Sequence, residues 1–373
     1  MIEIREVKTK KDIKTFVDFP NKLYKDCEFF SYPLRSDEMG NFNPKKNLSL
    51  KYCEVATYLA YKDGEVAGRV QAIIQKQYNE KVKENRVRFS RFDSINDKEV
   101  AKALLSAVEN WAKAKGMDIV HGPLGYSDLD REGMLIDGFD SMSTFEEWYN
   151  YPYYKDLMEA CGYEKDCDWL ERKIYPPTEV DPKVKRVAEM VAKRYGLRLV
   201  DEKSKSKFLK KYKDGIFEVL DEAYGSLYGV VPYTEELKEQ LFKQFKSFID
   251  LKFCFVIVDK EDKVIAFGIA LPALNKAVYK SKGRLTIPAI FRLLHALKHP
   301  RVVDFAIVGV RPDYQNKGVI SLALEMMQQN MGKLVEYCET NLCLEDNYKI
   351  AQTWDYFKFD VVRRRRCWVK KLK

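Results

Sequence analysis

Residues 308–320 have the types and the spacing of a turn that binds an anion. They read Val-Gly-Val-Arg-Pro-Asp-Tyr-Gln-Asn-Lys-Gly-Val-Ile, an apolar segment followed by a proline and then by Gln315 and Gly318. The first N–H groups of a helix lack partners within the helix and lie at the positive end of its dipole, so a helix that starts here can hold a phosphate. Gly318 lets the ligand approach the backbone closely. The stretch therefore predicts a pyrophosphate site.

A strand and a helix must position this turn. Residues 305–310 form a short apolar, β-branched run of strand length. Arg311-Pro-Asp313 ends the strand, because proline cannot donate to a β-ladder and aspartate favours turns. The turn at 315–320 then enters a helix, whose apolar residues are Leu322, Leu324, Met326 and Met327.

The chain repeats one order of elements in its two halves. The matching segments are 2–17 with 197–212, 57–74 with 253–271, and 156–173 with 353–370. Segment 57–74 is predicted to be a hairpin that Lys62-Asp-Gly64 closes. Two halves of near-equal length with the same elements indicate a tandem duplication. The proline-rich segment 175–182 reads as a connector. We therefore expect a first domain at 1–175 and a second at 183–373.

The run at 308–320 resembles the acyl-CoA signature of the GNAT superfamily of N-acyltransferases, V-x-P-x-[YF] followed by [QR]-x-x-G-x-[GA]. Gln315 and Gly318 match that signature, while Ile320 departs from its final small residue. The resemblance implies acetyl-CoA or another acyl-CoA as cofactor. It places the cofactor on Val308, Gly309, Val310, Gln315, Asn316, Lys317, Gly318, Val319, Ile320 and Asn347.

A second element of the same family follows at 335–359. Asn347 and Phe359 fall at the family spacing, whereas Ile350, Trp354 and Lys358 replace the usual alanine, tyrosine and glycine. In the family that tyrosine often protonates the departing thiolate. Tryptophan cannot do so at neutral pH.

A carboxylate must deprotonate the attacking amine. Asp304 lies eleven residues before Gln315, which matches the place of the glutamate base in histone-type GNAT enzymes. Glu345 is the other candidate, and Glu339 on the same predicted strand is a rival. A solvated aspartate at the end of a strand remains an alternative for Asp304.

The first half keeps the same order of elements but lacks the signature. Its helix at 97–115 has an apolar stripe, formed by Val100, Leu104, Val108 and Trp111. The segment before this helix has no glycine and several carboxylates, which would repel a pyrophosphate. We expect this domain to have lost cofactor binding. The glycine-rich, aromatic segment 121–154 suggests an acceptor pocket that faces the second domain. Its candidate residues are Tyr126, Asp137, Tyr151 and Tyr154; the alternative is a long loop that packs the domains together.

Beyond the signature, most of the chain is similar to bacterial tandem GNAT proteins whose substrate is undefined. The resemblance implies an α+β fold with three layers, in which two GNAT-like domains each contain a mixed, mainly antiparallel sheet flanked by helices. We expect an enzyme that moves an acyl group, in the simplest case acetyl, from CoA to the amine of a small molecule or an amino-acid-like acceptor. Two alternatives stay open: an aminoacyl-tRNA-dependent transferase of the peptidoglycan cross-bridge type, and an inactive acyl-CoA-binding protein.

Composition sets further bounds. The net charge of +9 suits an acidic ligand but is too mild to indicate nucleic acid by itself, so tRNA enters only through the alternative that the run Arg363–Arg366 supports. His295 and His299 lack a third ligand, so we expect a solvated basic helix rather than a metal site. Eight cysteines without a paired spacing, and no export signal or long apolar window, favour free thiols in the cytoplasm and no membrane role.

Overall fold

The computed structural model describes residues 1–373 apart from 178, 180, 333, 348–353, 355, 356 and 373. The chain forms two compact units, and neither is continuous in sequence. The first comprises Met1–Leu170, Leu274–Leu293 and Arg363–Lys373, and the second comprises Glu171–Ala273 and Leu294–Val362. These units differ from the expected division at 175–183, because a segment of the second half and the C-terminal strand pack with the first unit.

The sheet of the first unit is mainly antiparallel. Its strands pair in the order β1 (Ile2–Glu6), β2 (Cys53–Lys62), β3 (Glu65–Gln75), β4 (Arg86–Ser94), β5 (Ile119–Gly122) and β14 (Lys358–Lys371). Only the pair β4–β5 is parallel, and β6 (Met134–Asp137) adds to β14. The predicted hairpin forms between β2 and β3, with Asp63 and Gly64 both at positive φ as a tight hairpin turn requires.

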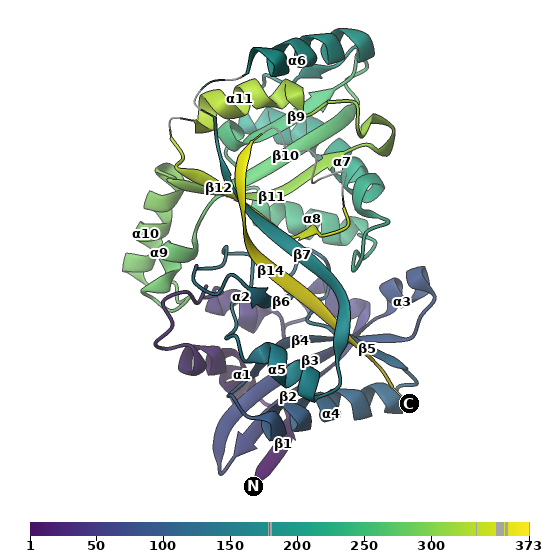
Figure 1. The fold of residues 1–373 in the computed structure, drawn as a ribbon, viewed down its shortest axis with the longest axis vertical. Coiled ribbons are helices and arrows are strands. Elements are labelled where there is room, and N and C mark those ends of the chain that lie inside the picture. The colour runs from purple at the N-terminus through teal and green to yellow at the C-terminus, as the bar shows by residue number, and fades with distance from the viewer. Residues whose placement is uncertain (178, 180, 333, 348–353, 355–356, 373) are drawn as a thin grey trace. The chain divides into compact units, whose positions relative to one another are not determined.

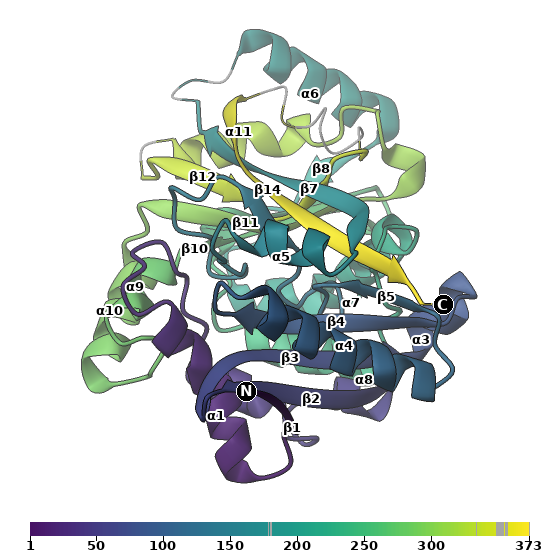
Figure 2. The same ribbon diagram turned by 60° about the horizontal axis from the view of Figure 1, so that its bottom comes forward.

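Helices cover this sheet. They are α1 (Lys10–Leu23), α2 (Arg35–Gly40), α3 (Lys76–Val82), α4 (Lys98–Ala114), α5 (Tyr154–Ala160), α9 (Asn275–Tyr279) and the start of α10 (Ile287–Lys298), with a 3₁₀ turn at Leu48–Lys51. Figure 2 shows α4 lying across β3 and β4. The apolar stripe predicted for α4 is confirmed, since Val100, Leu104 and Val108 are fully buried in the core of this unit.

The second unit has a mixed sheet. Its strands pair in the order β7 (Glu164–Tyr175), β12 (Tyr337–Thr340), β11 (Val302–Val310), β10 (Val264–Pro272), β9 (Cys254–Val258) and β8 (Arg198–Leu199), and the short β13 (Cys343–Leu344) pairs with β7. Among these strands β11 and β12 run parallel, and the other pairs described are antiparallel.

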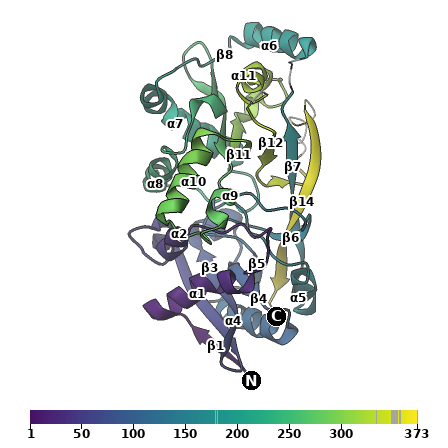
Figure 3. The same cartoon turned by 90° about the vertical axis from the view of Figure 1, so that its left-hand side faces the viewer.

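Two layers of helices flank this sheet (Figure 3). The helices are α6 (Pro182–Tyr195), α7 (Lys205–Tyr224), α8 (Glu235–Phe245) and α11 (Ser321–Met331), with 3₁₀ turns at Leu251–Phe253 and Pro312–Tyr314. Residues of α6 and α11 form one apolar cluster and residues of α7 form another, each with alternate side chains of β9 and β10. The α+β class and the three layers expected from the sequence are therefore present.

No helix in the described part of the chain has both the length and the apolar content needed to cross a membrane. All eight cysteines are free thiols.

Candidate active site of the second unit

Strand β11 extends beyond its parallel neighbour. Strand β12 pairs with it from Val302 to Phe305, whereas β10 pairs with it as far as Val310. On the β10 side, Phe305 and Ile307 face consecutive residues, so Ala306 is an extra residue in a β-bulge. A bulge bends a strand, and here it lies where β11 and β12 separate. The last residues of β11 thus present main-chain groups on the side that β12 has left.

Side chains hold this end of β11 in place. The Tyr224 hydroxyl, from α7, donates to the carbonyl oxygen of Val308 at 2.9 Å. The Gln315 amide donates to the carbonyl oxygen of Val310 at 3.2 Å. Gln315 therefore acts on the protein backbone in this structure, and it supports the site by fixing the turn to the strand.

Arg311 anchors the start of the turn, a role that its sequence context did not indicate. Its side chain is 4% exposed. Its Nε donates to the carbonyl oxygen of Val264 at 2.7 Å, and its guanidinium pairs with Glu218 at 2.8 Å and with Glu222. Such charge-assisted bonds are stronger than neutral ones, so the turn leaves β11 from a fixed point.

The turn extends to Ile320. Helix α11 begins at Ser321, whose N–H and hydroxyl both bond to the carbonyl of Gly318. Asn316 and Gly318 have φ values of 60° and 70°. Left-handed residues within a turn before a helix are typical of the concave N–H arrangements that bind anions. The backbone at 316–320 therefore fits a phosphate group.

Position 318 favours glycine because of its backbone conformation, and not because space for a side chain is lacking. A Cβ at this position would lie 3.5 Å from Val187 and 3.6 Å from Val191, which are ordinary contacts with α6. A left-handed conformation, however, costs other residues roughly 1–2 kcal/mol.

A cation lies beside the turn. The Lys317 ammonium is 5.1 Å from the ring centres of both Tyr195 and Tyr314, and these rings meet edge to face at 6.1 Å. The rings keep Lys317 next to the concave backbone, where its charge favours an anion. Tyr195, at the end of α6, lies too far away in the sequence to be placed here without the structure.

Two carboxylates lie opposite each other where β11 and β12 are still paired. Asp304 is in register with Glu339, and both residues are only 9% exposed. The negative charge of Asp304 also acts on Cys338, whose pKa is raised to about 12 first by burial and then by this charge. Asp304 is thus a buried strand residue rather than the solvated one considered as an alternative.

Glu345 and Asn347 follow β13, and both side chains are half-buried. The Asn347 N–H bonds to the carbonyl of Leu344 at 3.1 Å. Ile350, one of the residues that depart from the family pattern, lies outside the described residues.

Trp354 packs in the position where the family has a tyrosine. Its side chain is 4% exposed, and its ring lies 5.5 Å from that of Phe305, at the point where β12 separates from β11. The indole therefore closes the apolar side of the site.

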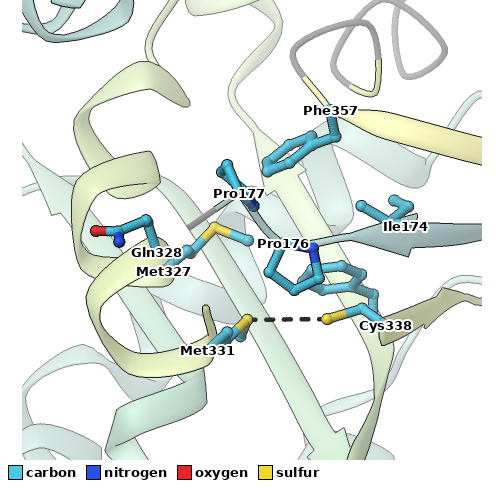
Figure 4. Close-up of a pocket in the computed structure, with 9 residues that line it drawn as sticks. Ile174, Pro176, Pro177, Met327, Gln328, Met331, Cys338 and Phe357 are labelled. Atoms are coloured by element: carbon cyan, nitrogen blue, oxygen red, sulfur yellow. Dashed lines mark hydrogen bonds between the residues drawn. The ribbon is translucent and has the colours of Figure 1, made fainter. Parts of the chain in front are cut away.

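An apolar pocket lies next to these rings (Figure 4). It is small, with a volume of about 10 Å³, which is room for about one water molecule. The residues that line it are Ile174, Pro176, Pro177, Phe305, Met327, Gln328, Met331, Cys338 and Phe357. Thioether and thiol groups from α11 and β12 form one wall, and methionine side chains adapt to ligands of different shape.

The first unit offers no comparable turn at α4. The Asp97 carboxylate caps this helix by accepting from the N–H groups of Glu99 and Val100, and Lys62 pairs with the same carboxylate. These N–H groups are therefore satisfied by the protein, which favours the prediction that the first unit does not bind the cofactor.

The four residues predicted to bind the acceptor have different environments. Tyr154 is fully buried, and its hydroxyl bonds to Tyr24 at 2.7 Å and to Asp93 at 3.2 Å. Tyr126 is 2% exposed. These two residues are buried in the first unit, and their role as ligand contacts stays a prediction. Tyr151 is half-buried and Asp137 is exposed, and their role stays a prediction.

The four arginines of the run 363–366 are either buried or paired with a buried carboxylate. Arg363 and Arg365 are at most 1% exposed, while Arg364 and Arg366 pair with the buried Asp168 at 3.2 and 2.8 Å. The run does not form a surface patch, which removes the observation that favoured a tRNA ligand.

The fold described here is like that of a solved tandem GNAT protein. That protein, from the clavulanic acid biosynthesis pathway, superposes with a TM-score of 0.56 at 10% identity, covering 100% of this chain and 98% of that one. This likeness shows that the two chains share a fold.

Two curated proteins are similar in sequence. A bacterial ceramide synthase of Caulobacter vibrioides is 27% identical over 324 residues, which are 84% of this chain and 82% of that protein. Protein YghO of Escherichia coli is 26% identical over 318 residues, 84% of this chain and 79% of that protein. No family model matches the chain.

Proposed function

We propose that the chain is an acyl-CoA-dependent N-acyltransferase that acylates a primary amine. The observation that carries the proposal is the left-handed turn at Asn316 and Gly318, directly beyond the end of β11 that has separated from β12. An anion-binding turn next to a strand end that has lost one of its two neighbours suits a ligand that has a pyrophosphate at one end and a carbonyl at the other.

Each part of this site would have one task. The backbone of Asn316 to Ile320 and the Lys317 ammonium would hold the pyrophosphate. Acyl-CoA would supply the thioester whose carbonyl carbon the amine attacks. Main-chain groups of Val308 to Val310 would orient this carbonyl, with Asn347 beside them.

Asp304 is the base that the arrangement favours. It lies on β11 just before β11 and β12 separate, and Glu339 is its partner in register on β12. Glu345 is the alternative base, since it follows β13 and is half-buried. Trp354 cannot protonate the thiolate, so water or the protonated base would do so.

The relative named a ceramide synthase suggests a narrower candidate function. Ceramides are amides of a fatty acid with a long-chain amino alcohol, so their synthesis is also N-acylation. The small apolar pocket between α11, β11 and β12 would then widen, by movement of its methionine side chains, to take part of an acyl chain longer than acetyl. We propose long-chain amino alcohols as an acceptor class to be tested beside small amines and amino acids.

A CoA-release assay tests the proposal directly. The purified chain is incubated with acetyl-, octanoyl- or palmitoyl-CoA and with a panel of small amines, amino acids and a long-chain amino alcohol. Amine-dependent release of free thiol together with an amide product supports an N-acyltransferase. Thermal stabilisation by acyl-CoA without release in any combination would instead indicate an inactive binding protein. Stabilisation by aminoacyl-tRNA but by no CoA compound would contradict the proposed donor.

A further inference from the structure

Exposed apolar side chains are concentrated on α10 and on the loop before it. The large exposed apolar residues of the described chain include Leu285, Ile287, Ile290 and Phe291, and Leu294 continues the row. Ile287 and Phe291 are 73% and 68% exposed. Positions 287, 290, 291 and 294 lie on one side of a helix, and the fully buried Ala289 lies on the opposite side. Helix α10 thus turns its apolar side to solvent.

The charge of the surrounding segment is entirely positive. Residues 275–301 contain no aspartate or glutamate. They contain the basic residues Lys276, Lys280, Lys282, Arg284, Arg292, Lys298 and Arg301. Within the described chain, no ion pair is found for Lys276, Lys280, Lys282 or Arg284, and all four are exposed. This one segment carries much of the net charge of +9.

The first unit holds this surface rigidly. The Gly283 carbonyl accepts from the Arg35 N–H at 2.9 Å, and Gly283 has a φ of 72°. A Cβ on Gly283 would lie 1.9 Å from the carbonyl oxygen of Pro33, so only glycine fits. The Arg292 Nε donates to the carbonyl of Ala277 at 2.9 Å, which joins α10 to α9, and the two helices lie side by side in Figures 1 and 3.

We propose that α10 and residues 280–286 form a docking surface for an anionic lipid bilayer. The apolar row would enter the boundary between headgroups and acyl chains, and the lysines and arginines beside it would contact lipid phosphates. Charge favours this occupant over a second copy of the chain, because a symmetric interface would bring two segments of the same positive charge together. The sequence analysis predicted a solvated basic helix and no membrane role. We replace the second of these predictions because the structure exposes an apolar row on α10. The proposal does not depend on the proposed enzymatic activity.

Vesicle sedimentation tests the proposal. The full chain is mixed with vesicles of phosphatidylcholine alone or with about one third phosphatidylglycerol. We expect binding to the anionic vesicles, weaker binding at high salt, and little binding to pure phosphatidylcholine. The double variant Ile287→Ser/Phe291→Ser should reduce the bound fraction at least about fivefold. Lys282→Glu/Arg284→Glu should reduce it on anionic vesicles as well.

Matched control variants distinguish binding through this surface from nonspecific adsorption to vesicles. Met190→Ser and Leu334→Ser remove apolar side chains of similar exposure elsewhere, 59% and 56%, and Lys203→Glu/Lys207→Glu reverses exposed charges on and before α7. These variants should bind vesicles like the unmodified chain, and all variants should melt cooperatively. An equal loss of vesicle binding in the test variants and in the control variants would overturn the proposal. The proposal would also be overturned if mutation of the apolar row changed the oligomeric state but left vesicle binding unchanged. The row would then be an interface between copies of the chain.

Discussion

The side-chain amide of Gln315 donates a hydrogen bond to the carbonyl oxygen of Val310, 3.2 Å away, and so fastens the turn to the strand that it leaves. The signature glutamine therefore shapes the backbone in this structure. Its effect on a ligand is indirect, through the N–H groups that follow it.

Gln315→Ala should weaken the binding of acyl-CoA about fivefold to tenfold, the effect of losing one neutral hydrogen bond worth about 1 kcal/mol. Isothermal titration with CoA measures the change. Gln329→Ala, at an exposed position on α11, is the control and should bind CoA normally. Unchanged binding in Gln315→Ala would show that the turn keeps its shape without this bond.

Gly318→Arg should abolish the thermal shift that CoA produces while the protein still melts cooperatively. The matched control is Gly64→Arg, because Gly64 also has positive φ but lies in the β2–β3 hairpin with open space around it. Both variants should lose roughly 1–2 kcal/mol of stability from the strained backbone. Only Gly318→Arg should lose the CoA response; a retained response would move the phosphate site elsewhere.

Asp304→Asn should lower kcat about 100-fold, within the usual range for removing a general base. The acidic limb of the pH–rate profile should also disappear. Glu345→Gln, the rival candidate, should leave kcat within about tenfold. The opposite result would assign the base to Glu345. Circular dichroism of each variant checks that the buried site at Asp304 still folds.

Met327→Trp should fill the pocket beside α11 and lower kcat/KM for long acyl-CoAs about tenfold relative to acetyl-CoA. Met326→Trp is the control, since Met326 lies on the same helix but does not line the pocket. An equal loss for all chain lengths would show that the pocket does not receive the acyl chain.

Asp168→Asn should destabilise the protein by about 1–3 kcal/mol at pH 7, because it removes the charged partner that the partly exposed Arg366 and Arg364 share. Burial alone would raise the pKa of Asp168, but its bonds to Arg366 and Arg364 lower the pKa below the ordinary 3.8. This stabilisation is present above that value and is lost as pH falls through the lowered pKa. Urea unfolding at several pH values should therefore show the two proteins converging in strong acid. A constant difference would exclude the charged pairing as the cause.

Local patterns predicted much of the fold. Pro312 and Gly318 delimit a strand, a turn and a helix, Asp63 and Gly64 form a hairpin, and the stripe of α4 is buried. Each of these features depends on neighbours in the sequence. The family resemblance supplied the rest of the architecture.

Features that depend on distant residues were not predictable from these patterns. The apolar spacing of α10 has the same period as a buried face, and the sequence cannot show which side of the helix meets Ala277. The four arginines before Cys367 read as a polar run because Asp168 lies far away in the sequence. The burial of Tyr126 and Tyr154 was likewise not evident from the aromatic run that contains them.

Strand β14 has a consequence for how the chain is made. Residues from Arg363 onwards belong to the first unit, where they pair with β5 and β6 and neutralise Asp168. During translation, the first 170 residues leave the ribosome long before this strand exists. The amino-terminal unit must therefore wait, with an open sheet edge and without the arginines that pair with Asp168, until nearly all of residues 1–373 have been synthesised. Gene fragments cut between the two halves of the sequence should accordingly yield insoluble products.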